Sequence, residues 1–256
     1  MRPILWGLLF AAAAALSGCA HQADACDRVR DVPHTECQSL VGFYDATNGP
    51  HWKDQRGWLE TSSVCDWHGV VCEDGHVAAV SLNYNDLQGP FPVTLTDLPH
   101  LKRVSLYYNA LTGSLPPEIG RLTELQVLIL HHNRLTGPLP PEMGQLTELQ
   151  KLDLDGNKIS GAIPPEMGRM TSLQDLMVRG NDLSGPIPPE LGRLSELRGL
   201  YLSNNRLSGR IPAELAGLSN LKMLDLLGND LTGPLPAGLE DVPSSGYEWL
   251  HYDSVP

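Results

Sequence analysis

The sequence predicts an α/β solenoid, a right-handed superhelix with parallel β-strands on its concave face and short 3-10 or helical turns on its convex side. The first observation is a 24-residue pattern, Leu-x-x-Leu-x-Leu-x-x-Asn-x-Leu-x-Gly-x-Ile-Pro-x-x-Leu-Gly-x-Leu-x-x, which occurs seven times without insertion or deletion. The second is that the copies fill one unbroken stretch, residues 77–244. The copies begin at Val77, Leu101, Leu125, Leu149, Leu173, Leu197 and Leu221.

Each repeat opens with a segment that predicts a short strand. In Leu125, Leu128 and Leu130 the apolar residues end in the alternation by which a strand places every second side chain in the core. Consecutive repeats should then pair their strands in parallel. An Asn follows each strand, and its amide can bond the backbone of neighbouring turns and continue from copy to copy. We interpret these residues as a structural ladder: Asn85, Asn109, Asn133, Asn157, Asn181, Asn205 and Asn229.

The second half of each repeat predicts an extended step followed by a tight helical turn. In Gly161-Ala162-Ile163-Pro164 the residue before Pro is pushed toward extended geometry. The next residues read Pro-Pro-Glu in most copies; Pro suits the first position of a helix, and Glu suits the positive end of the helix dipole. Short turns rather than long helices are therefore expected on the convex side.

Residues 32–76 are expected to form an amino-terminal cap. Within them, residues 36–47 carry apolar side chains at helical spacing and end at Asn48-Gly49-Pro50, which predicts one amphipathic helix and a turn. Three aromatic residues follow: Trp52, Trp58 and Trp67. Such a cap would cover the open edge of the first strand and the end of the leucine core.

The remaining segments are expected to be short. Residues 19–31 should form a tether before the amino-terminal cap. Residues 245–256 should form a minimal carboxy-terminal cap, since they follow a last repeat in which Pro-Pro-Glu has become Pro236-Ala237-Gly238. This segment contains Tyr247, Trp249, Leu250 and Tyr252.

The first residues resemble a bacterial lipoprotein signal. An uncharged apolar run from Ile4 to Leu16 is too short to cross a bilayer, and Leu16-Ser17-Gly18-Cys19 resembles a lipobox. Residues 1–18 would then be removed and Cys19 lipidated, with the acyl chains as the membrane anchor. The alternative is an ordinary secretory signal, cut near Ala23 or Ala25. Since Ala20 follows Cys19, outer-membrane sorting in a bacterial envelope is expected, with the protein facing either the periplasm or the outside.

Four Cys residues remain once Cys19 is assigned to lipid: Cys26, Cys37, Cys65 and Cys72. An even number in an exported chain indicates two disulfides, and the local pairings are favoured, Cys26 with Cys37 and Cys65 with Cys72. A metal site is the alternative, but no Cys-x-x-Cys element is present. We expect neither a metal nor a cofactor.

The net charge disfavours polyanionic partners. The chain carries a formal net charge of −12, and removing residues 1–18 deletes one charge, that of Arg2, to leave −13. No basic run reverses this balance locally. Nucleic acid is therefore not expected as a partner, and anionic lipid headgroups are disfavoured for the same reason.

The Leu-x-Gly-x-Ile-Pro step resembles the plant-type leucine-rich repeats. The stretch Trp58-Leu59 followed by residues 65–72, Cys-Asp-Trp-His-Gly-Val-Val-Cys, resembles the paired-Cys cap that precedes such repeats. The resemblance extends over about residues 40–244. Members of this family include ectodomains of plant receptor kinases and secreted inhibitors of cell-wall polygalacturonases, so the resemblance implies ligand binding. No transmembrane helix or kinase follows these repeats, which departs from the receptor pattern.

The strand positions that are not committed to the core are the candidate binding residues. The fifth and seventh residues of each repeat should face the concave surface, flanked by the third and eighth. Tyr84, Tyr108 and His132 should form one aromatic column, and Tyr107 and His131 a second. Such rings suit protein contacts or stacking on sugars and peptides, although they could also simply stabilise the sheet. The candidates are Tyr84, Arg103, Tyr107, Tyr108, His131, His132, Asp153, Asp155, Met177, Arg179 and Tyr201.

The function predicted from these features is non-catalytic recognition of a protein, peptide or glycan by a monomer. The inner face projects to roughly 460 Å², below the roughly 800 Å² that each partner contributes to a standard interface, so a folded partner would need further contacts. One alternative is a structural spacer or adhesin. Another is a hydrolytic or metal site at His131 and Asp155, which an open face without a pocket disfavours.

Overall fold

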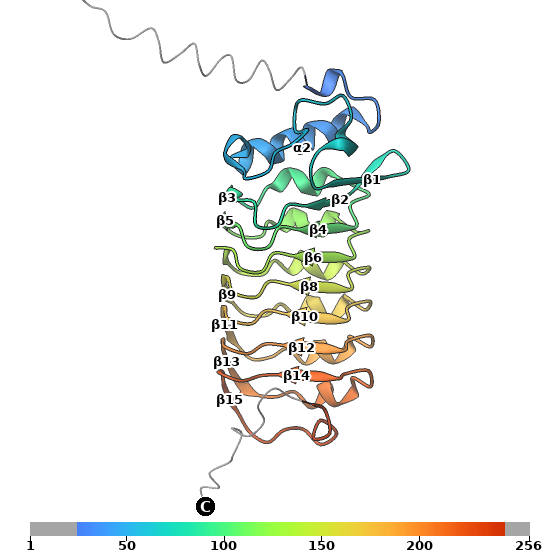
Figure 1. Ribbon diagram of the computed structural model, residues 1–256. Helices are drawn as coiled ribbons and strands as arrows, with labels where there is room; N and C mark the ends of the chain where they lie inside the picture. The colour runs from blue at the N-terminus through green and yellow to red at the C-terminus, as the bar shows by residue number, and fades with distance from the viewer. Residues whose placement is uncertain (1–24, 244–256) are drawn as a thin grey trace, which may run out of the picture.

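The computed structural model describes residues 25–243, which form a ladder of repeats beside an amino-terminal cap (Figure 1). The main sheet has the strand order β1-β2-β4-β6-β8-β10-β12-β14, and from β2 onward neighbouring strands pair in parallel. The predicted α/β solenoid is thereby confirmed. The strands are β1 (Val70–Glu73), β2 (His76–Ser81), β4 (Arg103–Ser105), β6 (Val127–Ile129), β8 (Lys151–Asp153), β10 (Asp175–Met177), β12 (Gly199–Tyr201) and β14 (Met223–Asp225).

A lateral row of strands and a row of turns complete the repeats. The lateral strands are β3 (Gln88–Pro90), β5 (Ala110–Thr112), β7 (Thr136–Gly137), β9 (Lys158–Gly161), β11 (Asp182–Gly185), β13 (Arg206–Arg210) and β15 (Asp230–Thr232). The 3-10 turns of the repeats are η3 (Val93–Asp97), η4 (Pro117–Arg121), η5 (Pro141–Gln145), η6 (Pro165–Arg169), η7 (Pro189–Arg193) and η8 (Ala213–Gly217). Turns η4 to η7 begin at a Pro, as the pattern predicted.

The leucine positions of the repeats form the core. In β6, Leu128 is fully buried, while its neighbours Val127 and Ile129 are half-buried on the other side of the strand. The turns contribute a second layer, since Ile119 of η4 and Met143 of η5 are also fully buried. Because the core takes every second strand side chain, the intervening side chains lie on the opposite surface, which we call the concave face.

The amino-terminal cap is built around the helix α2 (His34–Ala46), which confirms the expected helix. Phe43 of this helix packs edge-on against Trp52, with ring centroids 5.5 Å apart. Trp58 lies between Trp52 and Trp67, at 4.9 and 4.8 Å from their rings. The short turns η1 (Gly49–His51) and η2 (Val64–Asp66) connect these aromatic residues. The cap is therefore a small aromatic core that continues the leucine core of the repeats.

One element of the cap was not predicted. Strand β1 pairs antiparallel with β2, and its register shifts between Val71 and Cys72. This hairpin covers the outer edge of β2, which would otherwise present unpaired backbone groups. The described residues thus protect the first repeat by strand pairing as well as by aromatic packing.

Both predicted disulfides are present, Cys26–Cys37 and Cys65–Cys72. The first ties residues 25–31, expected to belong to a tether, to α2; Cys26 and Val29 are buried there. The described part of that segment therefore packs into the cap. Paired cysteines of this kind are typical of exported proteins.

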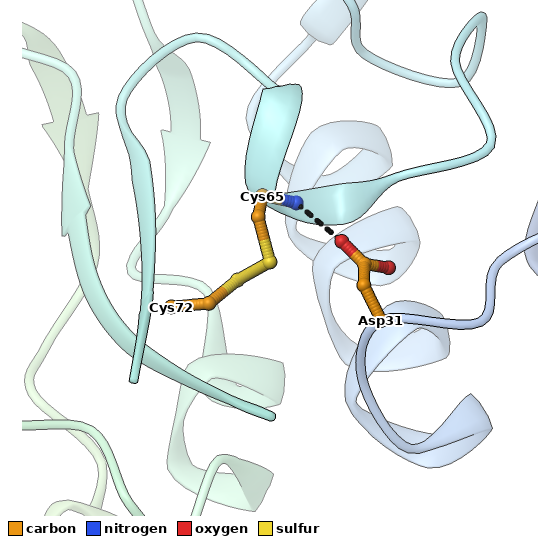
Figure 2. A group of neighbouring side chains, drawn as sticks. All are labelled: Asp31, Cys65 and Cys72. Carbon is orange, nitrogen blue, oxygen red and sulfur yellow. Dashed lines mark hydrogen bonds between the residues drawn. A yellow bond between two sulfur atoms is a disulfide. The ribbon is translucent and has the colours of Figure 1, made fainter. Parts of the chain in front are cut away.

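Asp31 and the disulfide Cys65–Cys72 form a close group (Figure 2). The carboxylate of Asp31 accepts hydrogen bonds from the N–H groups of Val64 and Cys65 and from the hydroxyl of Ser63. Burial alone would raise the pKa of Asp31, but these hydrogen bonds hold it below its ordinary value. Since both sulfur atoms are bonded to each other, they are not thiolate ligands, and the group is a structural link between the start of the cap and η2.

Several sequence-based expectations lie outside the described residues. These are the signal at residues 1–18, the lipidation of Cys19, the first part of the tether and the carboxy-terminal cap at residues 245–256. Within residues 25–243, no helix combines the length and apolar character needed to cross a bilayer.

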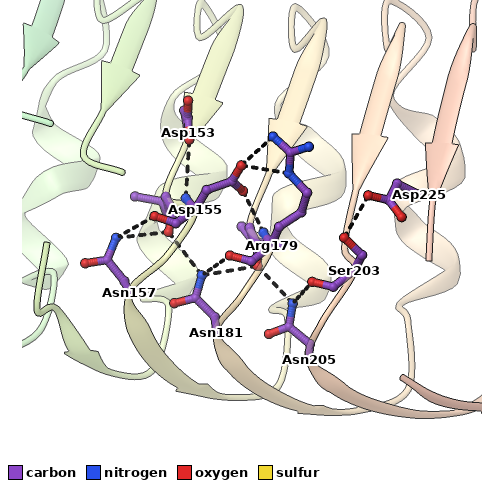
Figure 3. Close-up of polar contacts among 10 residues, drawn as sticks. Asp153, Asp155, Asn157, Arg179, Asn181, Ser203, Asn205 and Asp225 are labelled. Carbon is purple, nitrogen blue, oxygen red and sulfur yellow. Dashed lines mark hydrogen bonds and ion pairs between the residues drawn. The ribbon is translucent and has the colours of Figure 1, made fainter. Parts of the chain in front are cut away.

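The predicted asparagine ladder is confirmed (Figure 3). Asn157 shows the pattern: its Nδ2 donates to the carbonyl of Leu154 in its own repeat and to that of Leu130 in the preceding one, at 3.0 and 3.1 Å. Its Oδ1 accepts the N–H of Leu135 at 3.0 Å. Each such Asn thus satisfies buried backbone groups of two repeats, which holds the repeats in register.

Replacing a ladder residue should destabilise the protein strongly. Asn157→Ala leaves the Leu130 and Leu154 carbonyls and the Leu135 N–H without this partner, so we expect a loss of about 2–4 kcal/mol in the free energy of unfolding, measured by urea denaturation. Asn220→Ala, which removes one exposed bond to the Ser195 carbonyl, should cost less than about 0.5 kcal/mol. Equal effects of the two substitutions would contradict a structural ladder.

Candidate functional site

The eleven candidate residues all lie on main-sheet strands or directly after them. Arg103 begins β4 and is exposed, whereas Met177 ends β10 and pairs with Asp153 of β8 and Tyr201 of β12. The buried residue of each strand, such as Val104 in β4, alternates with these side chains. The strands therefore bring the candidates to one surface. Five aromatic candidates come from repeats one to three and Tyr201 comes from repeat six, whereas the charged candidates other than Arg103 come from repeats four and five.

The aromatic residues form the two columns expected from their positions. The ring of Tyr108 lies 4.5 Å from that of Tyr84 and 4.3 Å from that of His132, with interplanar angles of 9° and 28°. In the second column, the rings of Tyr107 and His131 lie 4.5 Å apart at 11°. Rings of different columns meet edge to face, as Tyr108 and His131 do at 85°. These spacings are those of offset stacks.

This packing changes the surface that a ligand would meet. Because each ring face lies against the ring of the next repeat, the columns present mainly ring edges, tyrosine hydroxyls and imidazole nitrogens. The sequence predicted rings that suit protein contacts or stacking on sugars and peptides. The stacked geometry favours hydrogen bonding and edge contacts instead.

The backbone of the eighth position was not foreseen from the sequence. Tyr84, Tyr108 and His132 have φ values of 56°, 52° and 53°, in the left-handed region. The same position in later repeats holds Gly156, Gly180, Asn204 and Gly228, which also have positive φ and are the residue types that tolerate it. The N–H of Tyr108 still bonds the carbonyl of His131 in the next repeat, at 3.0 Å. Repeat pairing thus holds bulky side chains in a costly conformation. The sequence signal for this backbone conformation was the three Gly and one Asn that hold the eighth position in repeats four to seven.

Beyond the aromatic columns, the face carries a polar network (Figure 3). Asp155 accepts from the backbone N–H and Nε of Arg179, and Nη2 of the same guanidinium lies 2.6 Å from Asp155 Oδ2. The guanidinium also lies over the ring of Tyr201, 4.9 Å from its centroid. Ser203 donates its hydroxyl to Asp225 at 2.7 Å. Ser203 and Asp225 were not among the candidates. They nevertheless hold the seventh and fifth positions of their repeats, which were expected to face the concave surface.

Two titratable residues, His131 and Asp153, lie where the aromatic part of the face in repeats one to three meets the charged part that begins in repeat four. Burial lowers the pKa of His131, although the nearby Asp153 carboxylate acts in the opposite direction. Burial raises the pKa of Asp153, and the neighbouring Asp155 carboxylate raises it further. His131 is therefore mainly neutral at pH 7, so the aromatic half of the face gains no charge from this imidazole.

The catalytic or metal-binding alternative at His131 and Asp155 is weakened by these contacts. Asp155 directs its carboxylate to Arg179, the next residue of the seventh-position column, rather than to His131. Among residues 25–243, the group of three possible metal ligands that lies close together is the one that contains the disulfide cysteines, away from this face.

The charge of Asp153 should be measurable in the titration of His131. We expect Asp153→Asn to lower the pKa of His131 further, because the substitution removes a negative charge that favours the imidazolium form. Nuclear magnetic resonance titration of the imidazole measures this pKa directly. Asp182→Asn, on a lateral strand, serves as the control and should leave it unchanged. A rise in the His131 pKa in Asp153→Asn would contradict this account.

Comparisons with known proteins agree with this architecture. A family model described as a leucine-rich repeat region matches residues 85–230, more than half of the chain. Among curated protein sequences, none matches this chain significantly.

Three solved structures are similar. The complex PEPR1–AtPEP1 is 28% identical with a TM-score of 0.71, over 78% of this chain and 29% of that one. A plant ice-binding protein is 29% identical with a TM-score of 0.71, over 79% and 73% of the two chains. Pollen Receptor Kinase 3 is 32% identical with a TM-score of 0.68, over 77% and 96%. The chain thus spans less than a third of the PEPR1 chain but nearly all of the pollen receptor chain. From its repeats, its asparagine ladder and these matches, we conclude that the chain belongs to the leucine-rich repeat family.

Proposed function

We propose that this protein is a non-catalytic recognition module, held by a lipid anchor in a bacterial cell envelope, that binds its ligand through the concave face. Of the ligand classes considered, protein, peptide and glycan, we favour an extended peptide or protein segment. The conclusion depends most on one observation: exposed aromatic side chains occupy left-handed backbone positions in repeats one to three.

The energies of these positions argue against a purely structural role. A left-handed conformation costs a non-glycine residue about 1–2 kcal/mol, so three such residues cost about 3–6 kcal/mol. The two ring pairs of that column return about 1–3 kcal/mol beyond their buried area. Tyr84 and Tyr108 also remain 55% and 42% exposed, which limits what burial adds. Since later repeats use Gly or Asn here, aromatic residues are better explained by ligand contact than by stability.

The size and chemistry of the face favour an extended ligand. A face of roughly 460 Å² is too small for a standard folded interface but sufficient for a peptide. The columns offer hydroxyls and ring edges, which suit the amides and side chains of a peptide better than they suit sugar stacking. The network around Arg179 adds further polar groups to the same face, in the repeats that follow the aromatic columns.

The similar structures support recognition in general but do not choose the ligand. One is a complex, one is named as a receptor and one is named as an ice-binding protein. The same scaffold therefore supports different ligands, and the ligand has to be argued from the site itself. A spacer or adhesin remains the alternative, in which the columns would serve only as cross-strand pairs.

Removing the aromatic columns should abolish binding without unfolding the protein. We expect the variant Tyr107→Ala, Tyr108→Ala, His131→Ala to lose capture of ligands selected from a random peptide library or a glycan array, while its circular dichroism spectrum stays unchanged. The three side chains contribute the edges and polar tips of both columns.

A matched variant on the other side of the solenoid provides the control. Glu142→Ala, Glu166→Ala and Glu190→Ala alter three convex turns and should leave capture intact. Ligand capture that survives in the aromatic variant would instead support the spacer or a different binding surface.

The lipid anchor is proposed from Leu16-Ser17-Gly18-Cys19, and it is tested by labelling. We expect the wild-type chain, expressed in a bacterium with two membranes, to incorporate labelled palmitate and to sediment with membranes. Cys19→Ser should lose both properties, because the thiol is the acylation site. An ordinary secretory signal predicts no label in either protein and a mature terminus near residue 23 or 25.

A further inference from the structure

The charges on the concave face are distributed unevenly along the solenoid. In repeats four to seven, the third, fifth, seventh and eighth positions hold four carboxylates and two cations. The same positions of repeats one to three hold one charged residue, Arg103. The carboxylates are Asp153, Asp155, Asp175 and Asp225, and the cations are Lys151 and Arg179. The face thus combines an aromatic half, in which Arg103 is the charged residue at these positions, with an acidic half.

Asp225 is an incompletely satisfied carboxylate at the far end of this acidic half. Only 6% of its surface is exposed. Its Oδ2 accepts the Ser203 hydroxyl at 2.7 Å, but its buried Oδ1 has no hydrogen-bond partner among residues 25–243. Buried carboxylate oxygens are normally paired, and leaving one unpaired costs free energy. A ligand could therefore supply the hydrogen-bond donor that residues 25–243 do not provide to this oxygen.

Asp153 is a second carboxylate of interest, and it lies at the border with the aromatic half. It is 8% exposed, and its Oδ1 accepts the Asp155 N–H at 3.3 Å. No ion pair joins it to a cation within residues 25–243, in contrast to Asp155, which is neutralised by Arg179. Burial and the Asp155 charge raise the pKa of Asp153, as expected for a carboxylate that lacks a counter-charge.

We propose that the ligand is an extended basic peptide, and that two of its Lys or Arg side chains form ion pairs with the carboxylates of Asp153 and Asp225. This inference rests on the proposed binding through the concave face and specifies its ligand. Both residues hold the fifth position of their repeats, three strand spacings apart, or roughly 14 Å at about 4.8 Å per strand. An extended peptide that rises about 3.3 Å per residue spans this distance in about four residues. At Asp225 the incoming cation donates to Oδ1, while the Ser203 hydroxyl keeps its bond to Oδ2.

The remainder of such a peptide reaches the aromatic columns. Six strand spacings separate the first repeat from the seventh, roughly 29 Å, which corresponds to about nine extended residues. The formal charge of −12 attracts a basic ligand to the protein as a whole and repels a polyanion. A polyamine also carries separated cationic groups, but it has no groups that would contact the aromatic half of the face.

The test is a selection from a random nonapeptide library with the full-length chain at low ionic strength. We expect enriched peptides to carry two Lys or Arg residues about four positions apart. The affinity of such a peptide should fall at least about tenfold in the variant Asp153→Asn, Asp225→Asn, since the basic groups lose their counter-charges. Glu166→Gln with Glu190→Gln removes the same number of charges from the convex turns η6 and η7 and should leave the affinity unchanged.

The outcomes separate this inference from the proposed function. Peptides that depend on Tyr107 and Tyr108 but lack the basic pair, or that bind the Asp153→Asn, Asp225→Asn variant equally well, would overturn the basic ligand and leave the concave site in place. Peptides whose affinity does not depend on Tyr107 and Tyr108, or a selection that yields no binders, would overturn both the basic ligand and the proposed binding through the concave face. Spermine that binds with the same dependence on both carboxylates would overturn a peptide as the occupant. Circular dichroism spectra of all variants establish that they are folded.

Discussion

The architecture of this protein depends on one buried side-chain amide in each repeat. In Asn133, for example, Nδ2 donates to leucine carbonyls of its own and the preceding repeat, while Oδ1 accepts an N–H from the preceding repeat. Each amide therefore connects two copies and leaves no freedom to slide them. Because the turn that precedes each Asn is held in this way, the side chains at the seventh and eighth positions line up from repeat to repeat.

The ladder also explains how the cap joins the solenoid. The first ladder residue, Asn85, has no preceding repeat, and its amide bonds the cap instead: Nδ2 donates to the Asp54 carbonyl, and Oδ1 accepts the Asp54 N–H. Asp31 and the two disulfides then hold the cap segments together. The cap thus replaces a missing repeat in both hydrogen bonding and apolar packing, so that the first binding positions rest on a rigid support.

A regular scaffold of this kind separates stability from recognition. The positions that build the core and the ladder are nearly invariant among the seven copies, so variation is confined to the concave face and the outer surface. The features that cost stability lie on that face. They are the left-handed aromatic residues in repeats one to three and the buried Asp225 carboxylate, whose Oδ1 has no partner among the described residues. Local costs of this kind are typical of binding surfaces, where a ligand supplies the missing interactions.

By itself, the sequence determined the fold class, the asparagine ladder, the disulfide pairing and the alignment of the aromatic columns. The disulfide pairing follows from the short separations between the cysteines. The other features follow from a strict period, because residues with the same phase in consecutive copies must lie side by side. Only the tertiary structure decided three other features: the β1–β2 hairpin, the left-handed backbone at Tyr84, Tyr108 and His132, and the pairing of Asp155 with Arg179 rather than with His131. These depend on backbone dihedral angles and on side-chain orientation within a column. A linear pattern specifies which residues are neighbours, but it does not specify which neighbour a flexible side chain contacts.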